Sequence, residues 1–326
     1  MIDSVELVTG GTRGLLNDAE IVKTAIGDKF KVNVNVSRER NFHLLHKRLL
    51  LACNLLAPAS NRLFIYFQIL PTAWLKLSGN NIFIPNQEFV RDETIADLEK
   101  CYQIWCKTKY AHKIFLDRGL DARYIGFSSE DLYLPNIEKD YSKFIHVAGR
   151  SHLKGTRTLL ELWVENPSWP TLNVVTSQSY FKDNFIAVNI NYLSDLSFSA
   201  LQQLMNQCGV HLCPSETEGF GHYINEAMST KALVITVDAP PMNELVPAGQ
   251  GLFAKYSREE IMSLSQRFFV DKNDLKNQII AAIDMNDTEK ARIGEMARAS
   301  FLERKLDFIK LINVQIDDFL QKKSGS

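Results

Sequence analysis

The feature of this sequence that most constrains its fold is a regular alternation of short apolar, β-branched runs with segments of helical periodicity. In the first half, the runs that read as strands cover 5–8, 30–36, 62–69, 81–85 and 102–106. Helical patterns separate them at 17–26, 92–100 and 107–119. Strands that alternate with helices pair in parallel, because each crossover helix returns the chain to the same end of the sheet. The pattern therefore predicts an α/β fold.

A polar stretch without periodicity, 126–142, is the predicted linker to a second alternation. There, apolar runs cover 144–148, 171–176, 184–190, 210–214 and 232–237, with helical patterns at 156–165 and 198–207. After about residue 256 the pattern is wholly helical. It ends in an amphipathic helix whose apolar face consists of Phe308, Ile309, Leu311, Ile312, Ile316, Phe319 and Leu320. We expect two doubly wound, Rossmann-like parallel-sheet domains, a short one over 1–140 and a second over 141–304, followed by a final helix over 305–322.

The charge balance and the cysteines exclude some classes of partner. The 326 residues carry 37 Lys and Arg against 38 Asp and Glu, so the chain lacks the basic field that attracts nucleic acid. The five cysteines do not show the short paired spacing of zinc sites, and most are expected to be free thiols in a reducing compartment. The amino-terminal residues show no export leader. The expected location is cytoplasmic, without nucleic acid as a partner.

Two carboxylates flank a Gly-Phe-Gly turn in the stretch PSETEGFGHYINEAMS, residues 214–229. Because a strand precedes the turn and a helix is expected from His222, Glu218 lies in the loop and Glu226 about one turn into the helix. Open α/β sheets bind ligands at such strand ends, and Gly219 and Gly221 let backbone N–H groups approach an anion or a sugar. We therefore predict that the glutamates hold a polyol-rich ligand. The alternative is that both are solvated surface acids.

A second cluster, AGRSHLKG at 148–155, also follows a predicted strand and opens a predicted helix. Arg150 and Lys154 lie four residues apart, a spacing at which both cations can converge on a diphosphate. Loop cations are more often solvated than bound to a ligand. However, this basic pair and the acidic pair follow strands of the same predicted sheet, which makes a chance arrangement less plausible.

Together, the two motifs resemble the donor-binding domain of family 4 (group 1) retaining glycosyltransferases. The resemblance covers about 144–250, where a Gly-Arg loop with a downstream Lys-Gly precedes two glutamates separated by seven residues. It implies the GT-B fold, in which two Rossmann-like domains face each other across a cleft and the final helix crosses back to the first domain. The Arg150-to-Lys154 interval is one residue shorter than the family pattern.

The resemblance also implies roles for individual residues in the transfer of a sugar from a nucleoside diphosphate sugar to a hydroxyl acceptor. Arg150 and Lys154 would neutralise the donor diphosphate, so no metal or other cofactor is expected. Glu218 would contact the transferred sugar and Glu226 the ribose. Backbone groups around Gly219, Phe220 and Gly221 would face the donor, with His222 as a further donor contact.

In the first half the resemblance is weaker. Gly10 and Gly11 follow the first predicted strand and match the family's glycine loop, which approaches the donor from the opposite wall of the cleft; an ordinary turn is the alternative. The family's central-loop histidine is replaced by Gln87 or Glu88, which we place at the acceptor side. The acceptor itself is expected to be a glycan, a glycolipid or a glycoprotein.

The segment 38–56 combines basic residues with an apolar face. It has two interpretations, packing against its own sheet or peripheral contact with an anionic membrane surface. Two other functions also remain open from the sequence: a sugar-nucleotide epimerase of similar fold, and a non-catalytic GT-B-like partner that binds nucleotide sugars. His146 and His211 lie inside predicted strands and are expected to be hydrogen-bonded core histidines.

Overall fold

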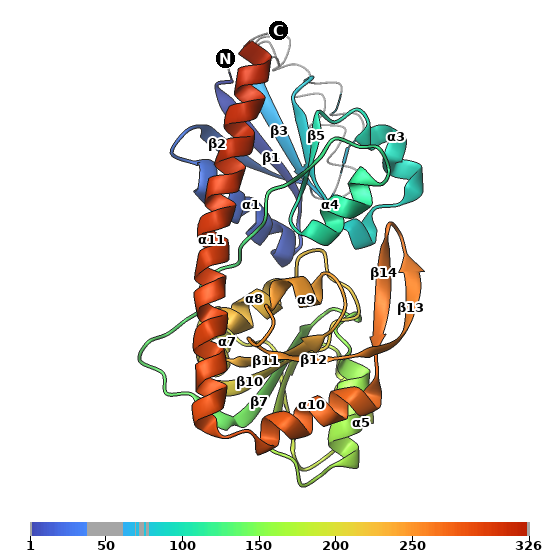
Figure 1. The fold of residues 1–326 in the computed structure, drawn as a ribbon, viewed down its shortest axis with the longest axis vertical. Coiled ribbons are helices and arrows are strands. Elements are labelled where there is room, and N and C mark those ends of the chain that lie inside the picture. Colours follow the sequence, from blue (N-terminus) through green and yellow to red (C-terminus); the bar gives the residue numbers. More distant parts are fainter. Residues whose placement is uncertain (1, 38–60, 69, 72–74, 76–77, 325–326) are drawn as a thin grey trace. The chain divides into compact units, whose positions relative to one another are not determined.

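The computed structural model describes the chain apart from residues 1, 38–60, 69, 72–74, 76–77 and 325–326. The chain divides into two compact units (Figure 1). Unit 1 comprises Met1–Ser128, Met262–Ser265 and Arg304–Ser326, and unit 2 comprises Ser129–Ile261 and Gln266–Glu303. Each unit contains one six-stranded parallel sheet, which confirms the predicted α/β class.

The sheet of unit 1 has the strand order β2-β1-β3-β4-β5-β6. The strands are β1 (Ser4–Gly10), β2 (Lys31–Ser37), β3 (Arg62–Phe67), β4 (Asn81–Ile84), β5 (Gln103–Cys106) and β6 (Ala122–Tyr124). Both faces of the central strands are covered, so β3 and β4 are buried along almost their whole length. Such strands read as continuous apolar runs rather than as alternating patterns.

The helices of unit 1 are α1 (Arg13–Ile26), α3 (Ile95–Leu98), α4 (Lys109–Leu116) and the 3₁₀ turns η2 (Gln87–Phe89) and η3 (Asp92–Thr94). Thr108 caps α4 by accepting a hydrogen bond from the Ala111 amide at 3.1 Å, and Gly119 follows the helix at φ +76°. Phe115 of α4 packs with Phe64 and Tyr66 of β3 in the core. The predicted helix over 92–100 is shorter than expected, because its first three residues form η3.

The sheet of unit 2 has the order β12-β11-β10-β7-β8-β9. The strands are β7 (Asp140–Gly149), β8 (Leu172–Thr176), β9 (Ile190–Leu193), β10 (Cys208–Cys213), β11 (Leu233–Val237) and β12 (Leu252–Ala254). Its helices are α5 (Thr156–Glu165), α6 (Ser179–Asn184), α7 (Phe198–Gln207), α8 (His222–Ser229), α9 (Met242–Leu245) and α10 (Lys272–Asp284). Figure 1 shows α5 beside α10, where Lys272 pairs with Glu161 and Glu165 at 3.2 and 2.6 Å.

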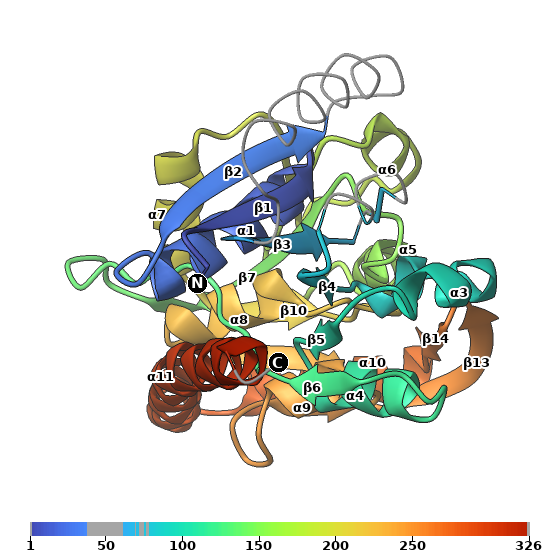
Figure 2. The same cartoon turned by 90° about the horizontal axis from the view of Figure 1, so that it is seen from above.

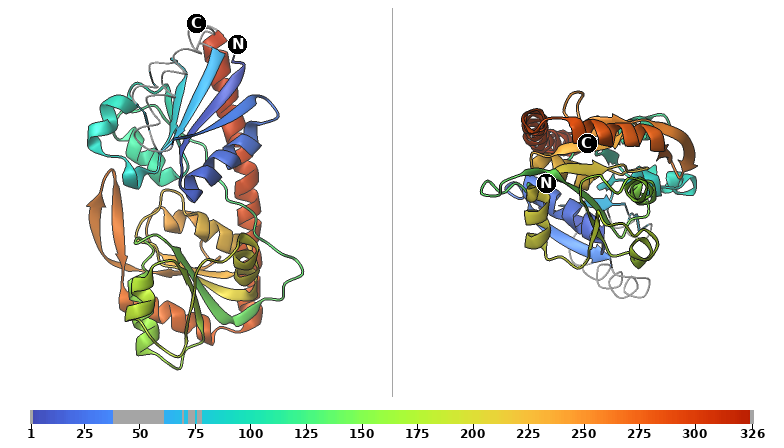
Figure 3. Two further views of the ribbon diagram at one scale, coloured as in Figure 1. Left: turned by 180° about the vertical axis from the view of Figure 1, so that it is seen from behind. Right: turned by 90° about the horizontal axis from the view of Figure 1, so that it is seen from below.

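The stretch before β7 forms neither helix nor strand over 126–139, as the sequence indicates, whereas 140–142 already belong to β7. It loops out from unit 2 in the view from behind (Figure 3). Its residues 131–134 are fixed to unit 2 by hydrogen bonds. The Leu132 amide donates to Ser229 Oγ at 3.1 Å, and the Asn206 side chain bonds the backbone of Leu132 and Leu134 at 2.8 and 2.9 Å.

A single helix, α11 (Asp287–Ser324), ends the chain. From Arg304 onward the helix belongs to unit 1, where Phe308 contacts Phe127 and Phe319 contacts Tyr102, each with ring centroids 4.9 Å apart. Of the predicted apolar face, Phe308, Ile312, Ile316 and Phe319 are buried. Ile309 is 38% exposed, so its place on that face was predicted wrongly.

Two further expectations from the sequence were wrong. The chain after residue 256 is not wholly helical, because β13 (Tyr256–Met262) and β14 (Ser265–Val270) form a two-stranded sheet. This hairpin stands apart from the β7–β12 sheet (Figure 2). The run 184–190 is not a strand over its first six residues: Ile186 and Val188 are 79% and 94% exposed, and β9 begins only at Ile190.

The segment 38–56, for which membrane contact was considered, lies outside the described residues. Within the part of the chain that the structure describes, no helix combines the length and the apolarity that crossing a bilayer requires.

Candidate functional site

Two loops of unit 2 follow adjacent parallel strands. The basic loop, 148–155, leaves β7, and the acidic loop, 214–221, leaves β10. From β7 the chain continues outward through β8 and β9 on one side, while β10 and β11 lie on the other. This is the topological switch point of the sheet, where open α/β folds bind their ligands at the carboxyl ends of the strands. Both loops therefore lie at the expected position of a ligand site.

The backbone joins the two loops to each other. The amide of Glu216 donates a hydrogen bond to the carbonyl of Leu153 at 2.9 Å. Gly155 adopts φ +65°, and a Cβ at this position would lie 2.1 Å from the carbonyl oxygen of Pro214. Only glycine fits this close approach and this left-handed conformation. The Lys-Gly pair of the basic loop thus packs directly on the start of the acidic loop.

Lys154 and Glu218 form an ion pair across the two loops, with Nζ 2.5 Å from Oε1. Their side chains are 16% and 11% exposed. The same Glu218 oxygen accepts a hydrogen bond from the Ser215 hydroxyl at 2.5 Å, and the Ser215 oxygen lies 2.5 Å from the Tyr223 hydroxyl. Because a carboxylate only accepts, Ser215 donates to Glu218 and accepts from Tyr223.

The Tyr223 ring also holds the cation of this pair. Lys154 Nζ lies 3.8 Å from the ring centroid, within the range of a cation–π contact. Burial raises the pKa of Tyr223 well above its ordinary value, so its hydroxyl stays protonated and can donate. The outcome is a lysine and a glutamate with fixed positions in a mostly buried setting, where charges act more strongly than in water.

The glycine turn opens α8. Gly221 adopts φ +93°, and a Cβ there would meet Leu245 at 2.7 Å. The Ile224 and Asn225 amides donate back to the Gly221 carbonyl, at 3.1 and 3.2 Å. The amides at the start of a helix point outward and favour an anion. Gly219 is buried, and Phe220, 3% exposed, packs edge-on against the His222 ring with centroids 5.3 Å apart.

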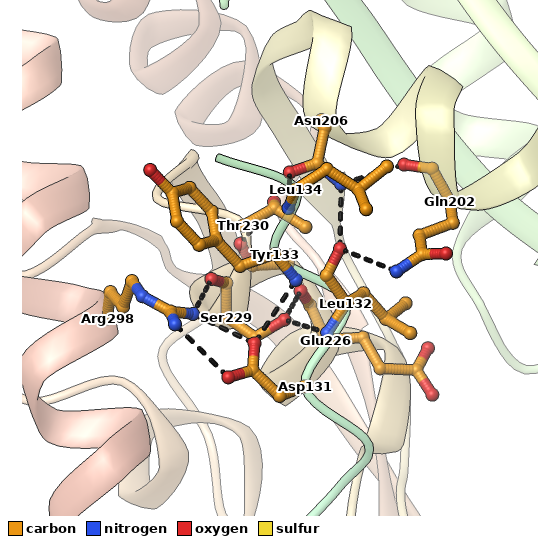
Figure 4. Close-up of polar contacts among 11 residues, drawn as sticks. Asp131, Leu132, Tyr133, Leu134, Gln202, Asn206, Glu226, Ser229, Thr230 and Arg298 are labelled. Atoms are coloured by element: carbon orange, nitrogen blue, oxygen red, sulfur yellow. Dashed lines mark hydrogen bonds and ion pairs between the residues drawn. The ribbon is translucent and has the colours of Figure 1, made fainter. Parts of the chain in front are cut away.

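The remaining predicted donor contacts lie around these loops. His222 Nδ1 is 2.9 Å from the hydroxyl of Ser129. Glu226 lies one turn further along α8, half-buried, and Figure 4 shows its carboxylate directed away from the Asp131–Arg298 pair. Arg150 has an exposed side chain. The structure thus brings Lys154 to Glu218, and it leaves Arg150 at the surface.

Both core histidines are satisfied, as predicted. His146 Nδ1 and Nε2 bond the carbonyl of Leu212 at 2.8 Å and the hydroxyl of Thr156 at 2.9 Å, and His211 Nε2 bonds the carbonyl of Met205 at 2.9 Å. Burial lowers the pKa of His146 to about 4 and that of His211 to about 3. The neutral His146 side chain therefore links β7 to β10 and to the start of α5 through hydrogen bonds.

The predicted residues of the first half lie in unit 1. Gly10 ends β1, and Gly11 is exposed just after it. Gln87 and Glu88 begin η2 and are 0% and 5% exposed, so both side chains lie inside unit 1. Gln68 follows β3 in a left-handed conformation, φ 55°, and its side chain accepts a hydrogen bond from Asn86 at 3.0 Å.

Sequence reasoning missed the residues that orient the site. Ser215 and Tyr223 stand inside the recognised motif, but nothing in their spacing shows that they bond each other. Ser129 pairs with a residue 93 positions away, which no local pattern indicates. Among the described residues, no three His, Cys, Asp or Glu side chains gather to hold a metal ion.

Comparison with known proteins points to one family. Residues 135–285 match the family "Glycosyl transferases group 1". An uncharacterized glycosyltransferase of Methanocaldococcus jannaschii is 28% identical over 203 residues, covering 59% of this chain and 52% of that protein. The chain spans about half the length of the curated relatives it matches, 54% and 52%.

Two solved structures share the fold over nearly the whole length of both chains. A sucrose-phosphate synthase of Thermosynechococcus elongatus superposes with a TM-score of 0.71 at 13% identity, covering 99% of this chain and 100% of that one. An Anabaena protein, HepE, solved in complex with UDP and glucose, gives 0.68 at 16% identity, with 98% and 99% covered. These likenesses confirm the predicted GT-B class, with two parallel sheets and a long C-terminal helix.

Proposed function

We propose that this chain, whose residues 135–285 match the group 1 glycosyl transferases, transfers a sugar from a nucleoside diphosphate sugar to a hydroxyl acceptor with retention of anomeric configuration. The observation that carries this proposal is the Lys154–Glu218 pair at the switch point of the unit 2 sheet. A cation for a diphosphate and a carboxylate for sugar hydroxyls stand there side by side. The acceptor is a glycan, a glycolipid or a glycoprotein.

The donor would bind along the two loops and the start of α8. Lys154 and Arg150 neutralise the diphosphate, and the outward amides at the α8 N-terminus, with His222, supply further donors. Glu226 binds the ribose hydroxyls, and Glu218 contacts the transferred sugar. Gly219, Phe220 and Gly221 keep the backbone open to the sugar. The exposed Arg150 side chain is free to turn toward an arriving anion.

Catalysis rests on electrostatics. As the bond between C1 of the sugar and the phosphate oxygen breaks, negative charge grows on the diphosphate and positive charge on the sugar ring. Lys154 stabilises the first charge and Glu218 the second. In a front-face route, the acceptor oxygen bonds C1 from the side of the departing phosphate, and the acceptor proton passes to the oxygen that leaves. No metal is required for any of these steps.

The first half would serve the acceptor. We propose that residues 1–140 form the acceptor-side domain, 141–304 the donor domain, and 305–322 a helix that returns to the first. Gly10 and Gly11 would approach the donor from the acceptor side, and Gln87 and Glu88 would support that side from within. The uridine nucleotide in the Anabaena structure makes UDP-sugars the first donors to test. We further propose a cytoplasmic location.

The test is the release of free nucleoside diphosphate from uridine, guanosine and adenosine diphosphate sugars. We expect slow release from one of them, lost in Glu218→Ala and kept in Lys272→Ala, which removes a lysine that pairs with two glutamates elsewhere in unit 2. Tight donor binding with no release under any acceptor would instead identify a non-catalytic binding partner. The appearance of an epimeric nucleotide sugar would identify an epimerase.

A further inference from the structure

The other carboxylate of the acidic loop, Glu216, has no part in the proposed chemistry, yet its amide, its carbonyl and its carboxylate are all engaged. Its amide donates to the carbonyl of Leu153 at 2.9 Å, and its carbonyl accepts from the amide of Phe268 at 2.7 Å. One carboxylate oxygen, Oε2, accepts from both Arg267 Nε at 2.6 Å and Nη2 at 2.5 Å. Glu216 therefore joins three segments: the basic loop, the acidic loop and β14.

Both contacts from β14 come from the hairpin that the sequence pattern did not predict. The Arg267 guanidinium also lies over the Phe269 ring, whose centroid is 4.5 Å from Cζ. The side chains of Arg267 and Glu216 are 32% and 13% exposed, and burial raises the pKa of Glu216 while Arg267 opposes that rise. Two guanidinium nitrogens converging on one carboxylate oxygen form a charge-assisted contact that holds that oxygen in place.

Glu216 lies next to residues of the candidate site, so its contact with Arg267 bears on the geometry of that site. Ser215 before it bonds Glu218, and Glu218 itself lies two residues after it. A shift of the Glu216 backbone would therefore move Glu218, which pairs with Lys154, and Ser215, which donates to Glu218. Arg267 also neutralises a carboxylate that would otherwise add negative charge beside the proposed diphosphate site.

We propose that Arg267 is a positioning residue, through which the β13–β14 hairpin fixes the acidic loop so that Glu218 and Lys154 meet the donor in a working geometry. The inference rests on the proposed function, since it assigns the hairpin a role in the same site. Arg267 acts through Glu216 and does not touch the donor.

The experiment compares Arg267→Ala, Arg267→Lys, Glu216→Gln and the double variant Arg267→Ala/Glu216→Gln. The matched control is Arg258→Ala. Arg258 lies on the same hairpin and stacks on the same Phe269 ring, 3.6 Å from its centroid, but it pairs with Glu260 of its own strand. Calorimetry measures the affinity for UDP, and an activity assay measures the rate of UDP release from UDP-glucose. Thermal unfolding shows whether each variant folds, and amide hydrogen exchange reports the local opening of the acidic loop.

In Arg267→Ala we expect UDP release to slow about 10- to 100-fold at saturating donor, with UDP affinity within about twofold of wild type. Arg267→Lys should recover part of the rate because it keeps the charge without the fork. The double variant should be no slower than Arg267→Ala alone, since the two residues act as one unit. Exchange across 214–221 should quicken about tenfold in Arg267→Ala and stay unchanged in Arg258→Ala.

Wild-type rates in a folded Arg267→Ala, or equal losses in Arg267→Ala and Arg258→Ala, would overturn the inference. If wild type binds no nucleotide and turns over no donor, the proposed function fails instead. Hydrogen exchange then decides the positioning role alone: quicker exchange in Arg267→Ala supports it, and unchanged exchange rejects it.

Discussion

The ammonium of Lys154 lies 2.5 Å from a carboxylate oxygen of Glu218, although 64 positions separate the two residues. The pair forms because β7 and β10 are neighbours in a parallel sheet, so that the loops leaving them meet at one edge. Gly155 against Pro214 and the Leu153–Glu216 hydrogen bond then bring the loops into contact. A donor diphosphate would compete with Glu218 for Lys154, which would leave Glu218 able to accept sugar hydroxyls.

Lys154 and Glu226 are expected to contact different parts of the nucleotide. Lys154→Ala should weaken the binding of both UDP and inorganic pyrophosphate, because it removes a cation from the diphosphate site. Glu226→Ala should weaken UDP binding about 10- to 100-fold, as expected for hydrogen bonds to a charged group, and leave pyrophosphate binding unchanged. Titration calorimetry with the two ligands separates these effects. Loss of pyrophosphate binding in Glu226→Ala would contradict the assignment of this residue to the ribose.

The close approach of the two loops makes a prediction about Gly155. Gly155→Ala would place an alanine in the left-handed conformation. Its Cβ would also lie 2.1 Å from the Pro214 carbonyl oxygen, which is a steric clash. Gly149→Ala is the matched control, because Gly149 has φ +58° in the same loop but no atom within 4 Å of its Cβ position. We expect Gly149→Ala to lower the free energy of unfolding by about 1–2 kcal/mol. Gly155→Ala should cost about 1–3 kcal/mol more.

Urea unfolding of the two variants measures this difference, and UDP calorimetry shows whether the site follows the backbone. Equal losses of stability in both variants would mean that the loops separate easily and that Gly155 serves only its own conformation.

Much of the fold could be predicted because burial dominates its strands and helices. β3 (Arg62–Phe67) begins where the predicted strand 62–69 begins, and α5 has the bounds of the helical pattern 156–165, since covered strands and amphipathic helices have distinct periods. The predictions were wrong where burial does not determine the secondary structure. β13 is exposed over six of its seven residues, so its charged residues carry no strand pattern and only pairing with β14 makes it a strand. Ile186 and Val188 are apolar but exposed, which no burial pattern reveals.

The candidate site shows the same division. Glu218, Lys154 and the glycines belong to short local motifs with a physical meaning, so their positions could be read from the chain. Arg267 and Ser129 reach the site from elements far away in the sequence, and their side chains carry no local signature of that partnership. Long-range positioning contacts of this kind become visible only when the sheet order is known.

Arg298 of α11 joins the linker to the end of α8. Its guanidinium bonds both Asp131 oxygens at 2.9 and 3.1 Å and the carbonyl of Ser229 at 2.5 Å, at the end of the helix that carries Glu226 (Figure 4). The Arg298 and Asp131 side chains are 15% and 28% exposed. Arg298→Lys keeps the charge but loses the fork, and it should lower the free energy of unfolding by about 1–3 kcal/mol.

The same helix supplies the control. Arg292 forms a fork with Glu289, at 2.8 and 2.7 Å, on the solvent side. Because exposed pairs are screened by water, Arg292→Lys should leave the urea midpoint almost unchanged. If the two substitutions shift the midpoint equally, the linker contact does not stabilise unit 2 as described.

The two core histidines predict how stability responds to acid. Burial lowers the pKa of His146 to about 4 and that of His211 to about 3, against 6.5 in an unfolded chain. Above pH 6.5 neither state binds a proton at these sites, so they add no pH dependence. Between pH 6.5 and 4 the unfolded chain takes up protons that the folded chain refuses, and the free energy of unfolding falls as the pH falls. Each histidine adds about 1.4 kcal/mol per pH unit in that range.

Urea unfolding at several pH values between 7 and 4.5 measures how steeply the free energy of unfolding changes with pH. A substitution that destabilises the fold equally at every pH changes the free energy of unfolding but not this slope. His211→Gln should remove one histidine's share of the slope, whereas His152→Gln, which changes an exposed loop histidine, should leave it as it is. The direction in which His211→Gln changes this slope distinguishes a neutral from a charged His211. A buried histidine held as a charged partner would instead stabilise the fold as the pH fell, so a steeper acid loss in His211→Gln than in wild type would show that His211 is protonated in the folded chain.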